Sequence, residues 1–180
     1  MKNIDWNKVE EAKDFERVKP GGYICGITAV KDVPEKEYLL IEYDIASGDF
    51  KGYYKALYDN KGFWGGSFIR SYSEKSLPFF KSFLTALSTS NPGFVYNNDE
   101  NTLIGKYIGL VIAEEEYKGN DGKIKPRPYV AQIRSVKAIQ ANDFYVPELK
   151  KLESGTSKSG AFGGEASGLN QIDGKLPWED

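Results

Sequence analysis

An alternation of apolar and polar residues over residues 37–45, EYLLIEYDI, constrains the fold of this chain more than any other feature. Every second residue there is apolar, which is typical of a strand with one buried face. The apolar face has Leu39, Ile41, Tyr43 and Ile45, and the opposite face has Glu42 and Asp44. Residues 23–31, YICGITAVK, are rich in β-branched and aromatic residues and predict another strand. The chain is therefore expected to fold around a β-sheet.

A helix is predicted over residues 76–90, where Pro78 fits the first helical turn and apolar residues recur at helical spacing. The apolar stripe has Phe79, Phe80, Phe83, Leu84 and Leu87. Residues 50–74 alternate aromatic clusters with glycines too often for a helix, so they predict strand and loop structure. A short N-terminal helix that covers the domain is expected around Trp6.

Residues 103–119 and 123–139 predict a long hairpin with Asp121-Gly122 in its turn. Pro126 and Pro128 place its second strand near an edge of the sheet, because proline cannot donate to a strand ladder. The predicted order is three strands, a helix and two strands. This is the element order of an OB-fold, a five-stranded β-barrel with a helix between strands 3 and 4 that binds oligonucleotides. We therefore expect a mainly β chain with an OB-fold.

The 180 residues suffice for one core, which we assign to an OB-fold domain over residues 1–152. Residues 153–180 have no periodic apolar pattern and many Gly and Ser residues, so a flexible linker is expected there. The charged start MKNIDWNKVEE is not expected to act as a signal peptide, and no apolar run is long enough for a membrane helix. A cytoplasmic location follows, in a host's cytoplasm if the chain is phage-encoded.

Several classes of catalyst are excluded by composition. The chain has no histidine, so a Ser-His-Asp triad and a histidine zinc site are impossible, and its one cysteine, Cys25, is expected to be a buried apolar residue. Neither a phosphate-binding loop nor a dinucleotide-binding motif occurs. The acidic stretches 97–100 and 114–116 lack calcium-loop spacing, so we expect no metal and no cofactor. Asp44 with Asp49 and Lys51 is a weak nuclease candidate, and we expect no enzyme.

Aromatic and basic residues coincide in residues 51–72, which is the combination that binding of single-stranded DNA requires: rings for stacking and cations for phosphates. The candidate residues there are Tyr54, Lys55, Tyr58, Phe63, Trp64, Phe68, Arg70 and Tyr72. On strands, Tyr54 and Tyr58 would share one face, and Phe68, Arg70 and Tyr72 another. The face with Arg70 is expected to be the binding surface, and Trp64, among glycines 62, 65 and 66, is expected at an exposed loop tip. The alternative for each ring is burial in the core.

Basic residues also gather around the predicted hairpin turn, in a chain of net charge −2. Residues 118–137 contain six basic residues and one acidic residue. The candidates for phosphate contact are Lys123, Lys125, Arg127 and Arg134. The alternative is a merely solvated charged turn.

Three segments resemble a family of small proteins from bacteriophages and prophages of Gram-positive bacteria. They are residues 20–54 (PGGYICGITAVKDVPEKEYLLIEYDIASGDFKGYY), residues 62–83 (GFWGGSFIRSYSEKSLPFFKSF) and residues 109–130 (GLVIAEEEYKGNDGKIKPRPYV). The resemblance covers roughly residues 3–152. Members of that family belong to replication and recombination modules, and some are described as single-stranded DNA-binding proteins. The resemblance implies a non-catalytic protein that coats and protects single-stranded DNA.

The C-terminal tip resembles the acidic tip of bacterial single-strand binding proteins, through which replication and repair enzymes are recruited. The matching residues are Asp173, Leu176, Pro177 and Trp178. Lys175 interrupts the acidic residues, and Glu179 and Asp180 follow the aromatic one, so the tip departs from that pattern. The resemblance implies replication or recombination proteins as partners of the tail. A homo-oligomer and an OB-like protein-interaction adaptor without DNA binding remain alternatives.

Overall fold

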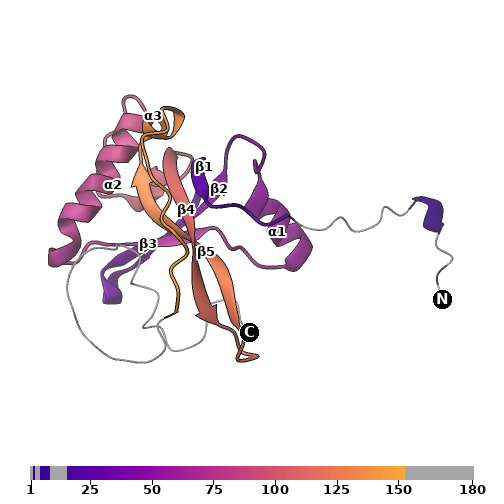
Figure 1. The fold of residues 1–180 in the computed structure, drawn as a ribbon. Coiled ribbons are helices and arrows are strands. Elements are labelled where there is room, and N and C mark those ends of the chain that lie inside the picture. Colours follow the sequence, from indigo (N-terminus) through magenta and orange to yellow (C-terminus); the bar gives the residue numbers. More distant parts are fainter. Residues whose placement is uncertain (1, 3–4, 9–15, 153–180) are drawn as a thin grey trace.

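The computed structural model describes residues 2, 5–8 and 16–152. Its centre is a five-stranded antiparallel sheet in the order β3-β2-β1-β4-β5 (Figure 1). The strands are β1 (Gly21–Val33), β2 (Tyr38–Ile45), β3 (Ser67–Ser71), β4 (Tyr107–Lys118) and β5 (Ile124–Arg134). The helices are α1 (Tyr53–Lys61), α2 (Leu77–Ser90) and α3 (Val136–Gln140). Short 3₁₀ turns lie at Trp6–Lys8, Pro34–Lys36, Glu74–Ser76 and Glu100–Leu103. Within these residues, no helix is both long and apolar enough to cross a membrane.

The predicted strand 37–45, the helix over 76–90 and the long hairpin are confirmed. In β2, buried and half-buried residues alternate along the whole strand. The hairpin turn closes through the backbone N–H of Gly119 to the carbonyl of Lys123 (2.8 Å), and Gly122 takes a positive φ of 73°. Phe79 does not belong to the buried stripe of α2, since it is 51% exposed. Residues 136–139, expected in a strand, belong to α3 (Val136–Gln140), whose first turn is capped by the Ser135 hydroxyl at the backbone N–H of Ala138.

The sheet is open, with β3 and β5 at its two edges. The prolines of β5 therefore lie on an edge strand, as the sequence predicts. Arg17 donates from Nη2 to the carbonyl of Pro126 (2.8 Å), which ties the segment before β1 to this edge. Within the described residues the five strands do not close into the expected barrel, and the OB-fold assignment stays a prediction. Of the expected N-terminal helix, only the 3₁₀ turn at Trp6–Lys8 lies within the described residues.

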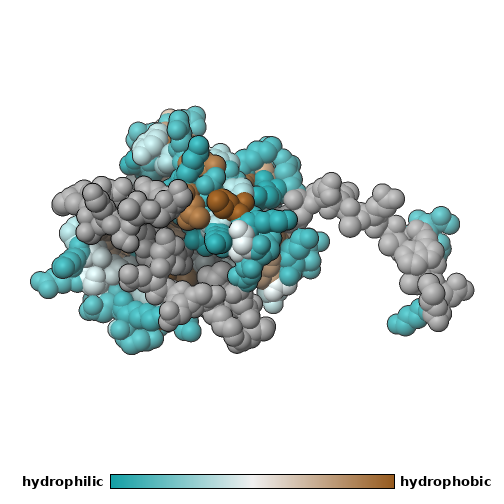
Figure 2. Space-filling model, turned by 60° about the horizontal axis from the view of Figure 1, so that its bottom comes forward, coloured by the Kyte–Doolittle hydropathy of each residue, from teal (hydrophilic) through white to brown (hydrophobic). Residues whose placement is uncertain are grey.

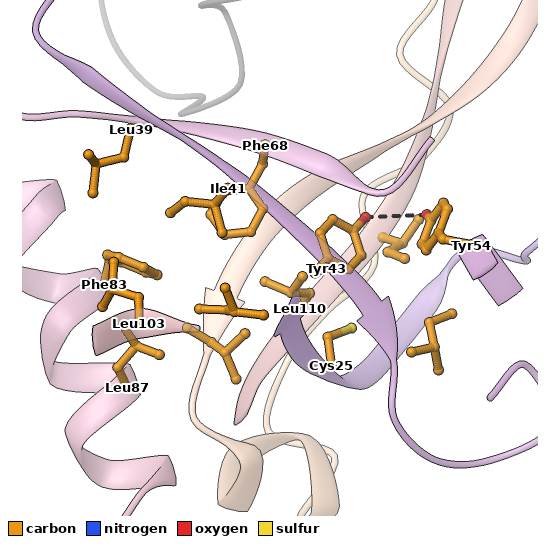
Figure 3. Packing of buried hydrophobic residues seen from close by; sticks show 14 of the residues in the cluster. Cys25, Leu39, Ile41, Tyr43, Tyr54, Phe68, Phe83, Leu87, Leu103 and Leu110 are labelled. Carbon is orange, nitrogen blue, oxygen red and sulfur yellow. Dashed lines mark hydrogen bonds between the residues drawn. The ribbon is translucent and has the colours of Figure 1, made fainter. Parts of the chain in front are cut away.

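One face of the sheet carries the main core. Side chains of β1, β2 and β4 meet the buried stripe of α2 there, as Figure 3 shows for Leu39, Ile41, Phe83 and Leu87. Cys25 lies in this core with no exposed surface, and burial raises the pKa of its thiol well above the ordinary value. The expectation of a buried apolar role for Cys25 is confirmed.

The other face is covered near β4 by α3 and the segment after it. A Cβ on Gly109 would lie 2.5 Å from Ile139, and a Cβ on Gly22 would lie 2.3 Å from the ring of Phe144, so both glycines permit close approach. Val111 is fully buried on this face. Beyond it, Lys150 bridges to β4 through its N–H to Glu114 (3.0 Å) and its carbonyl to Glu116 (2.8 Å).

Candidate nucleic-acid interface

Residues 53–61 form helix α1, so the strand predicted for this segment is wrong. Glycines flank the helix instead of breaking it: Gly52 and Gly62 are the caps, and both have the left-handed φ that glycine adopts without strain. The N-terminus of α1 has no side-chain cap of its own. The carboxylate of Asp44 on β2 supplies one, accepting from the backbone N–H groups of Tyr54 (2.9 Å) and Lys55 (3.1 Å). Asp44 is therefore a cap of helix α1.

Tyr54 is a core residue and not a stacking platform. It is 1% exposed, its hydroxyl lies 3.2 Å from that of Tyr43, and the two rings meet edge-on at 5.1 Å (Figure 3). Burial raises the pKa of both phenols above their ordinary value. Tyr54 therefore fixes α1 to the sheet from inside while Asp44 holds its first turn.

Three aromatic residues at the end of α1 form what we call the aromatic edge: Tyr58, Phe63 and Trp64. Tyr58 is 51% exposed and Phe63 38% exposed, whereas Trp64 is half-buried and donates from its indole N–H to the carbonyl of Gly66 (3.1 Å). The rings of Tyr58 and Trp64 lie 6.4 Å apart, tilted by 55°. Trp64 packs against Tyr58 and is less exposed than expected for a loop tip. Tyr58 and Phe63 provide the accessible surface of the edge.

Lysines lie on either side of this edge along α1. Lys55 and Lys61 are one helical turn before and one turn after Tyr58, and both are exposed. Lys55 is paired with Asp59 at 2.6 Å, so its charge is compensated in the free protein. Within the described part of the chain, Lys61 has no such ion pair, which makes it the better candidate for a phosphate contact.

The expectation that the Arg70 face of β3 is exposed is wrong. Phe68 and Arg70 are 7% and 9% exposed, and the guanidinium of Arg70 lies 5.8 Å from the centre of the Phe68 ring. Side chains of β3 alternate between the two faces of the sheet as predicted, but Phe68 and Arg70 lie on the face toward the core. Tyr72 is half-buried, donates to Asp32 (2.7 Å) and meets Phe80 edge-on. The outward face of β3 instead has Ile69, beside Leu40 of β2.

Residues 113–129 form a two-stranded ribbon that we call the arm. Pairing of β1 with β4 ends at Gly21 and Ile112, whereas β4 and β5 remain paired out to Lys118 and Ile124. The arm thus extends beyond the other strands of the sheet, at the end where β2 leads into α1 (Figure 1). Its tip is exposed.

Much of the predicted positive charge of the arm is already paired. Lys125 binds Asp121 (2.7 Å), and this bond holds the pKa of Asp121 below its usual range and raises that of Lys125. Arg127 binds Glu115 through Nε and Nη2, both at 2.9 Å, and its guanidinium lies 5.2 Å from the centre of the Tyr117 ring.

Two lysines of the arm remain available. Across the residues that the structure describes, Lys118 and Lys123 have no ion pair. Arg134 lies near the opposite end of β5 and donates to the side chain of Gln132 (3.2 Å), apart from the arm. Available positive charge at the arm is therefore confined to its tip.

Sequence reasoning missed Tyr107, which begins β4 and is 52% exposed. Tyr107 belongs to an apolar strand pattern that indicates burial. Its exposure depends on which elements lie next to the end of the strand, and the local pattern does not encode them. No cluster of metal-ligating side chains occurs in residues 2, 5–8 and 16–152. The tail candidates lie outside the described residues: Asp173, Leu176, Pro177, Trp178, Glu179 and Asp180. In the comparisons with known proteins, no family model and no curated protein matches this chain.

Proposed function

We propose that the protein is a non-catalytic single-stranded DNA-binding protein whose aromatic edge stacks on bases. The observation that carries the proposal is the exposure of Tyr58 and Phe63, beside Lys61, on and directly after a helix that is fixed to the sheet at two points. Stacking of a base on an aromatic ring contributes about 1–3 kcal/mol and accepts any base. A rigid helix keeps the entropy lost on binding small.

The strand order supports an OB-type architecture for this proposal. In an OB-fold, strands 1 to 3 form a meander, strand 4 pairs with strand 1, a helix precedes strand 4, and nucleic acid binds at the strand 2–3 face and the loops. The order β3-β2-β1-β4-β5 with α2 between β3 and β4 fits that arrangement. The loop Gly62–Gly66 leads from the aromatic edge directly into β3. A DNA strand bound at the aromatic edge would therefore lie beside the face formed by β2 and β3. The arm lies at the same end of the sheet.

An adaptor that binds only protein is the competing function. Among the described residues on the face drawn in Figure 2, most are hydrophilic and a few form a small apolar patch. A broad apolar docking surface is therefore not evident on the described part of that face. Service in phage replication or recombination, a cytoplasmic location and recruitment of partners by the tail remain part of the proposal.

The test is the affinity of the full chain for oligo-dT and for duplex DNA at several salt concentrations. We expect preference for oligo-dT and a loss of about tenfold or more for Tyr58→Ala with Phe63→Ala. Phe79→Ala is the matched control, because Phe79 is also exposed but lies on α2. Equal weakening by the control, or no binding of oligo-dT, would reject the proposal. Quenching of Trp64 fluorescence, with Trp6 and Trp178 replaced by phenylalanine, reports binding at the edge directly.

A further inference from the structure

A small hollow lies on the sheet face opposite the main core, between β1, the end of β2 and α3. It has a volume of about 260 Å³, and its walls include Ile24, Ala46, Tyr107 and Val136. Pockets for drug-sized ligands usually enclose about 300–1,000 Å³, so this one suits a single ring system. It is separate from the aromatic edge.

Tyr107 gives this hollow an aromatic wall, and the backbone of Tyr107 is held by Asn91. The side-chain amide of Asn91 binds its backbone on both sides, accepting from the N–H (2.9 Å) and donating to the carbonyl (2.8 Å). The ring lies beside Gly26 of the neighbouring strand, where an added Cβ would be 3.9 Å from Cε1. One side of the ring thus faces the sheet backbone while half of the side chain stays accessible.

Three polar side chains also line the hollow, and one of them, Ser90, is already bonded to the carbonyl of Ala86 and the N–H of Val136. Ser47 and Gln140 contribute a hydroxyl and a carboxamide, and in the described residues neither side chain has a hydrogen-bond partner. A hydroxyl and an amide together offer donors and acceptors. A planar ligand with apolar faces and a hydrogen-bonding edge would use all of these features, whereas an aliphatic side chain would leave the polar groups unused.

The hollow lies near the first turn of α1, the helix that carries the proposed DNA site at its other end. Gly26 is paired with Tyr107 on one side and with Asp44 on the other, so the three residues form one row across the sheet. Asp44 caps α1 in that row. Two inter-strand spacings separate β2 from β4, which is about 10 Å. The aromatic edge lies at the other end of the same helix, so a DNA strand that occupies both sites would run along α1.

We infer that this hollow binds one nucleobase of the bound strand, with Tyr107 as the stacking platform and Ser47 and Gln140 on the base edge. The inference rests on the proposed function and adds a second base site to it. Lys137, exposed on the same short helix as Gln140, provides positive charge nearby.

The experiment uses the full chain with oligo-dT and with the same oligonucleotide carrying one abasic position. Tyr107→Ala is expected to weaken binding of oligo-dT about fivefold or more, and Tyr107→Phe to leave it unchanged. Gln140→Ala should give a smaller loss. Tyr145→Ala is the matched control, because Tyr145 is an exposed tyrosine on the segment after α3. An abasic position that weakens the unaltered protein should have less effect on Tyr107→Ala, since the base contact is already lost.

Cross-linking of a photoactivatable thymine analogue to the unaltered protein gives a readout without any substitution. We expect a cross-linked peptide that contains Tyr107. If Tyr58→Ala and Phe63→Ala weaken binding while Tyr107→Ala does not, and no cross-link maps to β4 or α3, the second site is rejected and the DNA-binding function stands. If oligo-dT does not bind at all, both are rejected.

Discussion

The carboxylate of Asp44 caps helix α1 by accepting from the backbone N–H of Tyr54 at 2.9 Å. The two residues are far enough apart in sequence that no local capping pattern reveals the contact. Because Gly52 at the N-cap has no side chain, β2 provides the acceptor from outside the helix. Position and stability of α1 therefore depend on a residue of the sheet.

Removing this cap should destabilise the fold. We expect Asp44→Ala to lower the free energy of unfolding by about 1–2 kcal/mol, as for other caps. Chemical denaturation measures the change. Glu42→Ala is the control, because Glu42 lies on the same face of β2 and, in the described residues, makes no hydrogen bond to α1. An Asp44→Ala protein as stable as Glu42→Ala would contradict the capping role.

The hydroxyl pair of Tyr43 and Tyr54 predicts a coupling energy. Either single change to phenylalanine leaves one buried hydroxyl without its partner, which costs about 1–3 kcal/mol. Replacing both removes the unsatisfied group, so the double variant should lose less than the sum of the two single variants. A double-mutant cycle by denaturation gives the value, and additivity would show that the hydroxyls do not interact.

The same pair predicts instability in alkali. Burial raises the pKa of both phenols above the ordinary value, so the folded state holds these protons more tightly than the unfolded chain. Stability is then constant below the unfolded pKa of about 10 and falls as the pH rises above it. The bond from Tyr72 to Asp32 acts in the same direction and raises the pKa of Tyr72 to about 12. Denaturation midpoints across this range should fall for the unaltered protein and less for Tyr43→Phe with Tyr54→Phe.

Close packing at Gly66 gives another stability prediction. A Cβ there would lie 2.4 Å from the carbonyl oxygen of Tyr43 and 2.6 Å from the ring of Tyr54. Because the backbone cannot move aside cheaply, Gly66→Ala should cost more than the about 1–2 kcal/mol expected for an alanine held at a left-handed φ in open space. Gly48→Ala, at a positive φ of 83° with no neighbour within 4 Å, is the comparison. Equal denaturation midpoints for the two variants would contradict the packing argument.

Regular periodicity made most of the sheet and α2 predictable from sequence. The pattern in β2 is complete, and the turn at Asp121-Gly122 forms as its composition indicates. Helix α1 was not predictable in the same way, because its glycines are caps while its aromatic residues divide between core and surface. Tyr54 is buried and Tyr58 is exposed because Tyr54 contacts Tyr43, and no local sequence pattern encodes that contact.

The sequence predicted the residue types of the candidate site better than it predicted the face of the sheet on which they lie. Alternation correctly grouped Phe68 with Arg70, but it could not say which of the two faces is covered. Coverage depends on α2 and on the segment after α3, and that segment has no apolar period of its own. Tyr107 was missed for the same reason.

The lysines at the tip of the arm permit a test of the phosphate contacts in the proposed function. Lys123 has no ion pair among the described residues, whereas Lys125 is paired with Asp121. Each phosphate contact contributes about −0.7 to the slope of log affinity against log salt for single strands. We expect Lys123→Ala to reduce that slope by one contact and Lys125→Ala to change it less, because Asp121 already compensates Lys125. Removing Asp121 as Asp121→Ala frees Lys125 and should strengthen oligo-dT binding at low salt. If all three variants keep the salt slope of the unaltered protein, the bound DNA strand does not contact the arm. The aromatic edge is then the site to be tested.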